Sequence, residues 1–215
     1  MVSIALLFSC YDYSVIRYVI GVDEAGRGPL AGPVAVGAVL VPEEFDVLKA
    51  FPNVKDSKML TPAAREAIYE ELVARSRAGE LRFCVRFSYQ SYIDAFGITK
   101  AVRRALWSGV RALASEPRGV RVLLDGLLRA PDEYEQETIV HGDALVPIIS
   151  LASVAAKVRR DALMKRLAKQ FPKYGFEKHK GYGTLQHRAA IAHFGLSEIH
   201  RATFCRKLLV TEKLV

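Results

Sequence analysis

The chain has 215 residues and a mass of 23.8 kDa, which suits one compact domain with a small appendage better than two full domains. With 51% hydrophobic and 25% charged residues, its composition excludes a wholly disordered, collagen-like or coiled-coil protein. The net charge of +8 is uneven: residues 151–215 hold 14 Lys and Arg against 4 Asp and Glu, which leaves 17 against 19 in residues 1–150. A basic C-terminal third predicts a polyanionic partner such as nucleic acid.

The three cysteines are odd in number and form no Cys-x-x-Cys pair, so neither a disulfide framework nor a zinc site is indicated. We therefore expect a reducing, cytoplasmic compartment. The first ten residues are apolar, but the first positive charge, Arg17, follows this run instead of preceding it, which is the wrong polarity for a signal peptide. No apolar run is long enough for a membrane-spanning helix, so we expect no membrane association.

Two apolar, β-branched runs, Tyr18–Val22 and Val34–Val41, predict strands on either side of a turn rich in Gly and Pro. The turn is too short for a crossover helix, so the two strands should be antiparallel. Thr61 followed by Pro62 predicts the start of a helix that ends before Gly79.

Further along the chain, a strand is expected over Leu81–Phe87 and one helix from about Ser91, with its apolar stripe facing the core. A short strand, Val120–Leu124, leads directly into Asp125. Another helix begins near Pro147 and passes Asp161, a glycine-rich basic stretch follows, and Thr184 is a candidate N-cap for a last helical segment.

This order of elements predicts an α/β fold in which helices flank a mixed sheet that begins with an antiparallel hairpin. We expect a catalytic core over residues 1–165 and a basic helical extension over residues 166–215.

Four carboxylates follow apolar, strand-like runs. Asp23 and Glu24 end the first strand, Asp125 ends VRVLL, and Asp143 lies 18 residues further on in HGD. Carboxylates that gather at strand ends repel one another and stay ionised together only around a cation, and a purely oxygen ligand set favours Mg²⁺ or Mn²⁺. An acidic site beside a basic phosphate-binding surface is what two-metal phosphodiester hydrolysis requires.

Successive strand side chains point to opposite faces, so Asp23 and Glu24 serve one centre only if the chain bends or one of them contributes its carbonyl. Gly26 and Gly28 give the chain that freedom. The competing interpretation of these carboxylates is that they cap turns or are solvated.

The segment from Gly26 to Ala31 also matches the dinucleotide-binding pattern G-x-G-x-x-G/A after a strand, with Glu43 as a candidate ribose-binding acid. That pattern must open a helix, whereas Pro29 and Pro33 interrupt this turn and a strand follows. The sequence therefore argues against a nicotinamide-dependent oxidoreductase.

Several ordered motifs resemble ribonuclease HII from about residue 17 to 207. They are DEAGRGPLAGP, DSKML, LLDG, HGD, SLASVAAKVRRD, KGYGTLQH and HRATF. The resemblance implies a ribonuclease H-like fold and endonucleolytic hydrolysis of RNA in RNA/DNA hybrids. It also implies incision 5′ of single ribonucleotides in duplex DNA, which leaves 3′-hydroxyl and 5′-phosphate ends, as in ribonucleotide excision repair.

The resemblance assigns metal binding and catalysis to the same four carboxylates. It places the family's ribose-contacting glycine-arginine-glycine motif on Gly26, Arg27 and Gly28, where backbone groups approach the 2′-hydroxyl that distinguishes RNA from DNA. Tyr182, between two glycines, matches the tyrosine that packs on the sugar at the junction between ribonucleotide and deoxyribonucleotide. We expect a monomer, and no room for the extra N-terminal domain of ribonuclease HIII.

The sequence departs from the family at His141 and Ala144, where Lys and Ser are common, and at Leu127, where Asn is common. These changes bear on efficiency or metal preference.

Basic residues near the motifs are expected to contact phosphates as a group, although each alone is a solvated surface charge. The group comprises Lys58, Lys157, Arg159, Arg160, Lys178, Lys180 and Arg188, of which Lys58, Lys157 and Lys180 are the candidate substrate contacts. His193 should be packed against Phe194, and the histidines at 179, 187 and 200 have no assigned role. A nonenzymatic nucleic-acid-binding module is the remaining alternative, and it would bind hybrids without cutting them.

Overall fold

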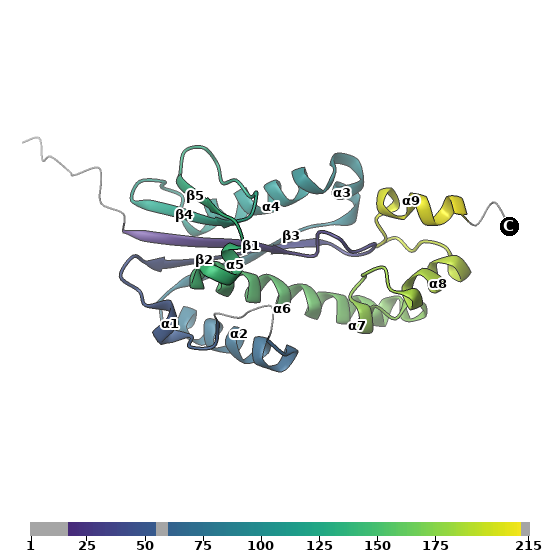
Figure 1. The fold of residues 1–215 in the computed structure, drawn as a ribbon, viewed down its shortest axis with the longest axis horizontal. Coiled ribbons are helices and arrows are strands. Elements are labelled where there is room, and N and C mark those ends of the chain that lie inside the picture. Colours follow the sequence, from purple (N-terminus) through teal and green to yellow (C-terminus); the bar gives the residue numbers. More distant parts are fainter. Residues whose placement is uncertain (1–16, 55–59, 212–215) are drawn as a thin grey trace, which may run out of the picture.

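The computed structural model describes residues 17–54 and 60–211, which form a five-stranded sheet between helical layers (Figure 1). The strands are β1 (Tyr18–Ala25), β2 (Val34–Pro42), β3 (Arg82–Ser88), β4 (Val120–Asp125) and β5 (Glu135–Ile139). The helices are α1 (Val47–Ala50), α2 (Pro62–Arg77), α3 (Gln90–Phe96), α4 (Ile98–Leu113), α5 (Gly142–Leu145), α6 (Pro147–Gln170), α7 (Phe176–His179), α8 (Leu185–Phe194) and α9 (Ala202–Thr211), with a 3₁₀ turn at Pro172–Tyr174.

The sheet has the strand order β3-β2-β1-β4-β5. β1 pairs antiparallel with β2, and β2 with β3, whereas β4 runs parallel to β1 and β5 parallel to β4. The predicted hairpin and mixed sheet are therefore confirmed. β5 is a largely exposed edge strand, which is why it lacks the apolar run that the sequence led us to expect before Asp143.

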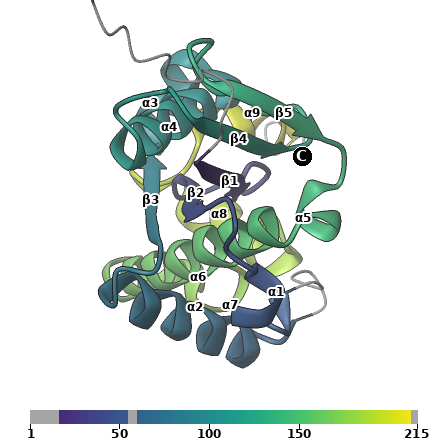
Figure 2. The same cartoon turned by 90° about the vertical axis from the view of Figure 1, so that its left-hand side faces the viewer.

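Side-chain alternation along the central strands builds two cores, one on each face of the sheet. Val36 and Ala38 of β2 belong to the core under α3 and α4, whereas Val39 and Val41 belong to the core under α6 and α2. Viewed end-on, α6 lies against the sheet and α1 and α2 lie outside α6 (Figure 2). The region of the sheet that carries the carboxylates is thus covered on both faces.

Close approach of α6 to the sheet depends on two strand glycines. A Cβ atom at Gly21 would lie 2.5 Å from the Ile148 carbonyl oxygen, and one at Gly37 would lie 2.2 Å from that of Ala152. Because no side chain fits at either position, the α6 backbone rests directly on β1 and β2. Residues on the inner side of α6 are thereby brought next to the end of β1.

One predicted helix is divided in two. Gly97 adopts a φ of 84°, and α3 ends there before α4 begins. The predicted N-caps Thr61 and Thr184 are both observed, with each hydroxyl oxygen accepting a backbone N–H in the first turn. The predicted core-facing stripe of Val102, Leu106, Val110 and Leu113 is buried on α4.

The C-terminal segment packs on the end of α6. Met164 and Ala168 of that helix share a third apolar cluster with Tyr174, Phe176 and Ile199. The expected division at residue 165 falls inside α6, so the helix is common to both parts, and the two-part organisation stays a prediction. Within the described residues, no helix is long and apolar enough to cross a membrane.

Candidate metal centre

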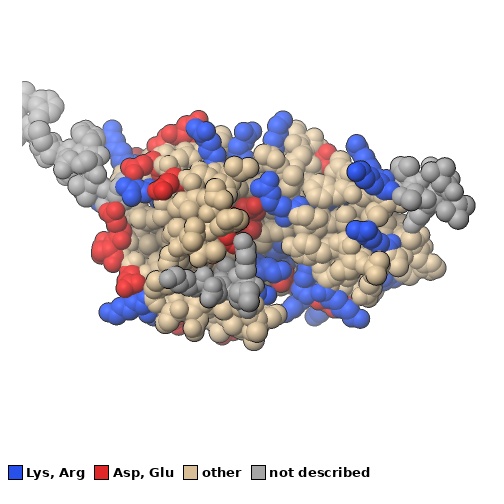
Figure 3. All heavy atoms as spheres, viewed as in Figure 1, with Lys and Arg blue, Asp and Glu red and all other residues tan. Residues whose placement is uncertain are grey.

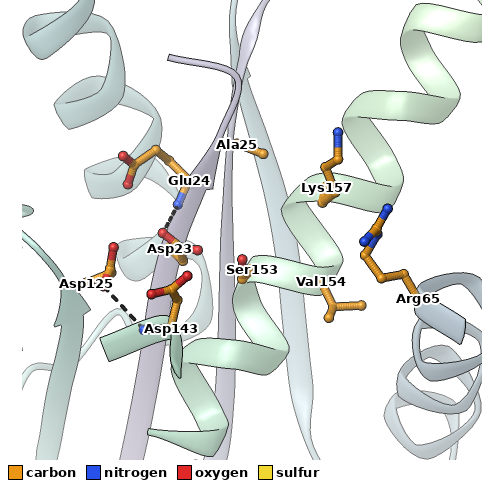
Figure 4. Close-up of a pocket in the computed structure, with 9 residues that line it drawn as sticks. All are labelled: Asp23, Glu24, Ala25, Arg65, Asp125, Asp143, Ser153, Val154 and Lys157. Atoms are coloured by element: carbon orange, nitrogen blue, oxygen red, sulfur yellow. Dashed lines mark hydrogen bonds between the residues drawn. The ribbon is translucent and has the colours of Figure 1, made fainter. Parts of the chain in front are cut away.

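The four predicted carboxylates line one pocket of about 380 Å³. Asp23 and Glu24 lie at the end of β1, and Asp125 ends the neighbouring parallel strand, where Val22 pairs with Leu124. The parallel register therefore brings Asp23 and Asp125 to the same level of adjacent strands. Figure 4 shows Asp23, Asp125 and Asp143 gathered together, with Glu24 beyond them.

Asp143 reaches the pocket from a short helix and not from a strand end. His141 takes a left-handed conformation with a φ of 57°, which turns the chain from β5 into α5. The Asp143 backbone N–H donates to Asp125 Oδ1 at 3.2 Å, and the Ser150 hydroxyl donates to the Asp143 carbonyl at 2.6 Å. These two hydrogen bonds fix the position of Asp143, which the sequence placed at the end of a third strand.

Burial makes negative charge costly in this pocket. Asp23 is only 6% exposed, and burial raises its pKa to about 7; the negative charges of Glu24 and Asp125 add to this effect, while a hydrogen bond from Ser153 opposes it. The pKa of Glu24 is also raised, chiefly by burial, although the Arg27 guanidinium acts in the opposite direction.

The donor set fits a hard divalent cation. Glu24 Oε2 is buried and accepts no hydrogen bond from the described residues. A cation would satisfy this oxygen and relieve the repulsion between the carboxylates. Among the described residues, no three His, Cys, Asp or Glu side chains already lie in an arrangement that could bind a metal ion. The four carboxylates therefore share a pocket, but their oxygens are not close enough together to coordinate one ion.

Arg27 and its flanking glycines lie beside the carboxylates in the β1–β2 turn. Arg27 Nη1 lies 3.2 Å from Glu24 Oε1, so its side chain contacts the site directly. Gly26 has a φ of 89°, and a Cβ there would lie 1.9 Å from the Arg160 guanidinium. A Cβ at Gly28 would meet no atom within 4 Å, so the surface at Gly28 is open.

Two buried arginines, Arg160 and Arg201, donate hydrogen bonds to backbone carbonyls of the β1–β2 turn. Arg160 donates to the carbonyl oxygens of Pro33, Lys180 and Ala31 at 2.9, 3.1 and 3.3 Å. Arg201 donates to those of Gly26, Arg27 and Gly32 at 2.7, 2.7 and 2.9 Å. The expectation that Arg160 is a solvated surface charge is wrong, because its guanidinium is fully buried and serves as a hydrogen-bond donor to the backbone.

Tyr182 lies near the pocket, with 42% of its surface exposed. The ring centroid lies 5.9 Å from Lys157 Nζ and 5.7 Å from Arg160 Cζ. Lys157 also lines the pocket and pairs with Asp161 at 2.9 Å, so it lies between Tyr182 and the carboxylates.

Of the other two candidate lysines, Lys180 is not part of this arrangement. Lys180 Nζ donates to the carbonyl oxygens of Glu177 and Lys178, away from the pocket lining. Lys58 lies outside the described residues.

Ser153 and Arg65 line the pocket but were not assigned from the sequence. Ser153 stands four residues before Lys157 on α6, and this helical spacing was a usable signal because the two residues share a face. Arg65, on α2, had no such signal, because only the packing of α2 against α6 brings it to the carboxylates (Figure 4).

The structure also bears on the dinucleotide-binding pattern and on His193. A strand, β2, follows the glycine-rich turn, so the helix required for dinucleotide binding is missing at that place. His193 packs against Phe194 as predicted, with ring centroids 4.4 Å apart, although both side chains are exposed.

Comparisons with known proteins agree with one another. A family model described as ribonuclease HII matches residues 20–207. Ribonuclease HII of Bacillus cytotoxicus is 44% identical over 189 residues, which cover 88% of this chain and 69% of that protein. The crystal structure of ribonuclease H2 from Pyrococcus horikoshii is similar with a TM-score of 0.71 at 25% identity, covering 91% of this chain and 99% of the other. The ribonuclease HII of a complex from Archaeoglobus fulgidus shares the fold, with a TM-score of 0.69 at 23% identity, covering 88% and 96%.

Proposed function

This chain belongs to the ribonuclease HII family and is a ribonuclease H-type endonuclease acting on RNA/DNA hybrids, and from that premise we propose a two-metal reaction at the four carboxylates. Its substrates include duplex DNA with single embedded ribonucleotides, which it incises on the 5′ side to leave 3′-hydroxyl and 5′-phosphate ends. The mixed five-stranded sheet flanked by helices is a ribonuclease H-like fold, as the sequence predicts.

The observation that carries the proposal is the convergence of Asp23, Glu24, Asp125 and Asp143 on one pocket in which an isolated charge is costly. These residues hold the divalent ions, Mg²⁺ or Mn²⁺. When bound, the ions supply an activated water and stabilise the developing charge on the leaving oxygen. Asp23 must lose its proton for this role, so metal binding at neutral pH is coupled to proton release.

The surrounding residues orient the substrate. Gly26, Arg27 and Gly28 present backbone groups to the ribose 2′-hydroxyl, and the buried arginines beneath the turn keep these groups in place. Tyr182 packs on the sugar at the junction. Lys157, between Tyr182 and the carboxylates, faces the phosphate next to the cleavage site.

The basic end of the molecule extends this surface. In the view of Figure 3, the half that contains α7, α8 and α9 shows basic side chains and few acidic ones. Contacts between these cations and phosphates position a duplex without reading its sequence. The enzyme works on such duplexes as a monomer and without a membrane.

The decisive experiment is cleavage of a labelled DNA duplex that contains one ribonucleotide, with Mg²⁺, with Mn²⁺ and with EDTA. We expect a single metal-dependent nick on the 5′ side of the ribonucleotide, with a 3′-hydroxyl end that a polymerase extends. Cleavage of long RNA/DNA hybrids without a nick at the embedded ribonucleotide would reject the proposed substrate range. Undiminished cleavage in EDTA would reject the metal mechanism.

A further inference from the structure

Three buried histidines lie together beneath the Gly181–Thr184 turn and have no part in the reaction proposed above. His187, His200 and His179 are 0%, 4% and 9% exposed. The rings of His179 and His187 stack with centroids 4.3 Å apart, and the buried Phe176 packs against all three. Two of them connect directly to the backbone of Tyr182.

The hydrogen bonds define where each proton lies. The Ser197 backbone N–H donates to His200 Nδ1 at 2.8 Å, so a neutral His200 carries its proton on Nε2. The Nε2 atoms of His200 and His187 are 3.0 Å apart, which makes His187 Nε2 the acceptor. His187 therefore carries its proton on Nδ1 and donates it to the Tyr182 carbonyl oxygen at 2.9 Å.

This chain of hydrogen bonds tolerates only neutral rings. A second proton on His187 would set two N–H groups against each other across the 3.0 Å contact, and one on His200 Nδ1 would oppose the Ser197 N–H. Burial supports the same conclusion, since it lowers the pKa of both His187 and His200 to about 4. The direction of the hydrogen bonds is therefore fixed at neutral pH.

We propose that His187 is a positioning residue that holds the Tyr182 backbone in the orientation that displays its ring to the substrate. The Tyr182 carbonyl also accepts the Thr184 N–H at 2.8 Å, and the Tyr182 N–H donates to the His179 carbonyl at 2.9 Å. The ring itself is 42% exposed, and its centroid lies 5.9 Å from Lys157 Nζ and 5.7 Å from Arg160 Cζ, which are loose contacts. Its orientation is therefore set mainly by its backbone.

The inference rests on the proposed role of Tyr182 at the junction, and two substitutions of one residue test it separately. His187→Asn keeps a donor near the Nδ1 position and loses the contact with His200. His187→Gln keeps a polar group near the Nε2 position and loses the hydrogen bond to Tyr182. For each variant, kcat/KM is measured on an embedded-ribonucleotide duplex and on a long hybrid, alongside the free energy of unfolding.

We expect His187→Gln to lower the ratio of embedded-ribonucleotide to hybrid cleavage by about fivefold, the equivalent of one neutral hydrogen bond, and His187→Asn to lower it less than about twofold. Equal ratios in both variants and the wild type, at matched stability, would overturn the positioning role. The proposed function fails differently: in that case the wild type itself does not incise the embedded ribonucleotide, or Tyr182→Ala leaves its ratio unchanged.

Discussion

At the scale of single residues, Asp125 is the carboxylate whose removal separates catalysis from folding most cleanly. Its charge raises the pKa of both Asp23 and Glu24, and its Oδ1 accepts only one backbone N–H from Asp143. An amide oxygen at the same place keeps that hydrogen bond and removes one negative charge from the pocket. The Asp125 carboxylate therefore destabilises the metal-free pocket, although the proposed function makes it a metal ligand.

For Asp125→Asn we expect at least about 100-fold slower cleavage of an RNA/DNA hybrid, because a metal ligand that supports several kcal/mol of transition-state stabilisation is lost. Hybrid binding should stay close to that of the wild type. Without metal, the variant should unfold at an equal or higher denaturant concentration, because carboxylate repulsion is relieved. Single-turnover cleavage, hybrid binding and urea unfolding in EDTA test these expectations. Wild-type turnover would remove Asp125 from the metal site.

The two glycines beside Arg27 form a second test at residue scale. Gly26→Ala must place a Cβ against the Arg160 guanidinium at a φ of 89°, so we expect a loss of about 3 kcal/mol in the free energy of unfolding. Gly28→Ala meets no protein atom and should change stability by less than about 0.5 kcal/mol, while it weakens hybrid cleavage by obstructing the ribose. Urea unfolding and kcat/KM distinguish the two. Normal hybrid cleavage by Gly28→Ala would refute the proposed close approach.

The gathering of the four carboxylates in one pocket was predictable because each follows a local apolar run or turn. Burial of Arg160 and Arg201 was not predictable. Apart from Lys180, their partners are backbone carbonyls 127 to 175 residues away, which come together only when the β1–β2 turn has formed. Likewise, Asp143 was predicted to join the others, but its route through α5 depends on the left-handed His141. Histidine is enriched among the non-glycine residues with positive φ, but such residues are too uncommon for the sequence to predict one at this position.

At the scale of elements, α6 connects the metal centre to the C-terminal segment. Its first half rests on Gly21 and Gly37, its middle carries Ser153, Lys157 and Arg160, and its end packs under Tyr174 and Phe176. Its start at Pro147 and its continuation past Asp161 followed from the sequence. The interruption between α3 and α4 did not, because a single Gly97 in an otherwise helical pattern is tolerated in many helices.

Contact between α6 and the sheet predicts unequal effects of two glycine substitutions. Gly37→Ala would place a Cβ 2.2 Å from the Ala152 carbonyl oxygen, which forces α6 from the sheet, so we expect a loss of 1–3 kcal/mol (roughly) in the free energy of unfolding. Gly109, inside α4, is the matched control. A Cβ there lies at an ordinary 3.5 Å from its neighbours, and Ala favours the helix by about 0.5–1 kcal/mol. Equal unfolding free energies for both variants would contradict the close packing.

At the scale of the whole molecule, two kinds of hydrogen bond hold the acidic body and the basic C-terminal segment together. The Asp94 carboxylate accepts from the backbone N–H groups of Ala202 and Thr203, and buried arginines donate to backbone carbonyls. Arg160 and Arg201 both end on backbone carbonyls, and the Leu30 N–H donates to the Gly181 carbonyl at 2.8 Å. The turn proposed to contact the ribose and the turn that carries Tyr182 are therefore joined by hydrogen bonds. The net charge of +8 separates along the sequence, but the structure joins the two regions at the active site.

The buried histidines and the carboxylates make opposite contributions to the pH dependence of stability. His187 and His200 have pKa values of about 4 in the folded protein and near 6.5 when unfolded, so the unfolded state binds more protons between these values and stability is lost as pH falls. Asp23, with a pKa of about 7, binds its proton more tightly when folded, so its contribution grows as pH falls from 7 toward 4. In the metal-free wild type the two effects partly cancel.

Removing the contribution of Asp23 should therefore expose that of the histidines, with Glu24, whose pKa is also raised, opposing them to a smaller extent. In an Asp23→Asn background we expect the free energy of unfolding to fall by about 2 kcal/mol for each neutral ring between pH 7 and pH 5. Adding His200→Gln should remove about half of that slope, because one buried titrating ring is gone. Urea unfolding in EDTA at several pH values measures both slopes. If the Asp23→Asn protein is as stable at pH 5 as at pH 7, the rings under Tyr182 are not held neutral, and the fixed hydrogen-bond direction through His187 is lost with them.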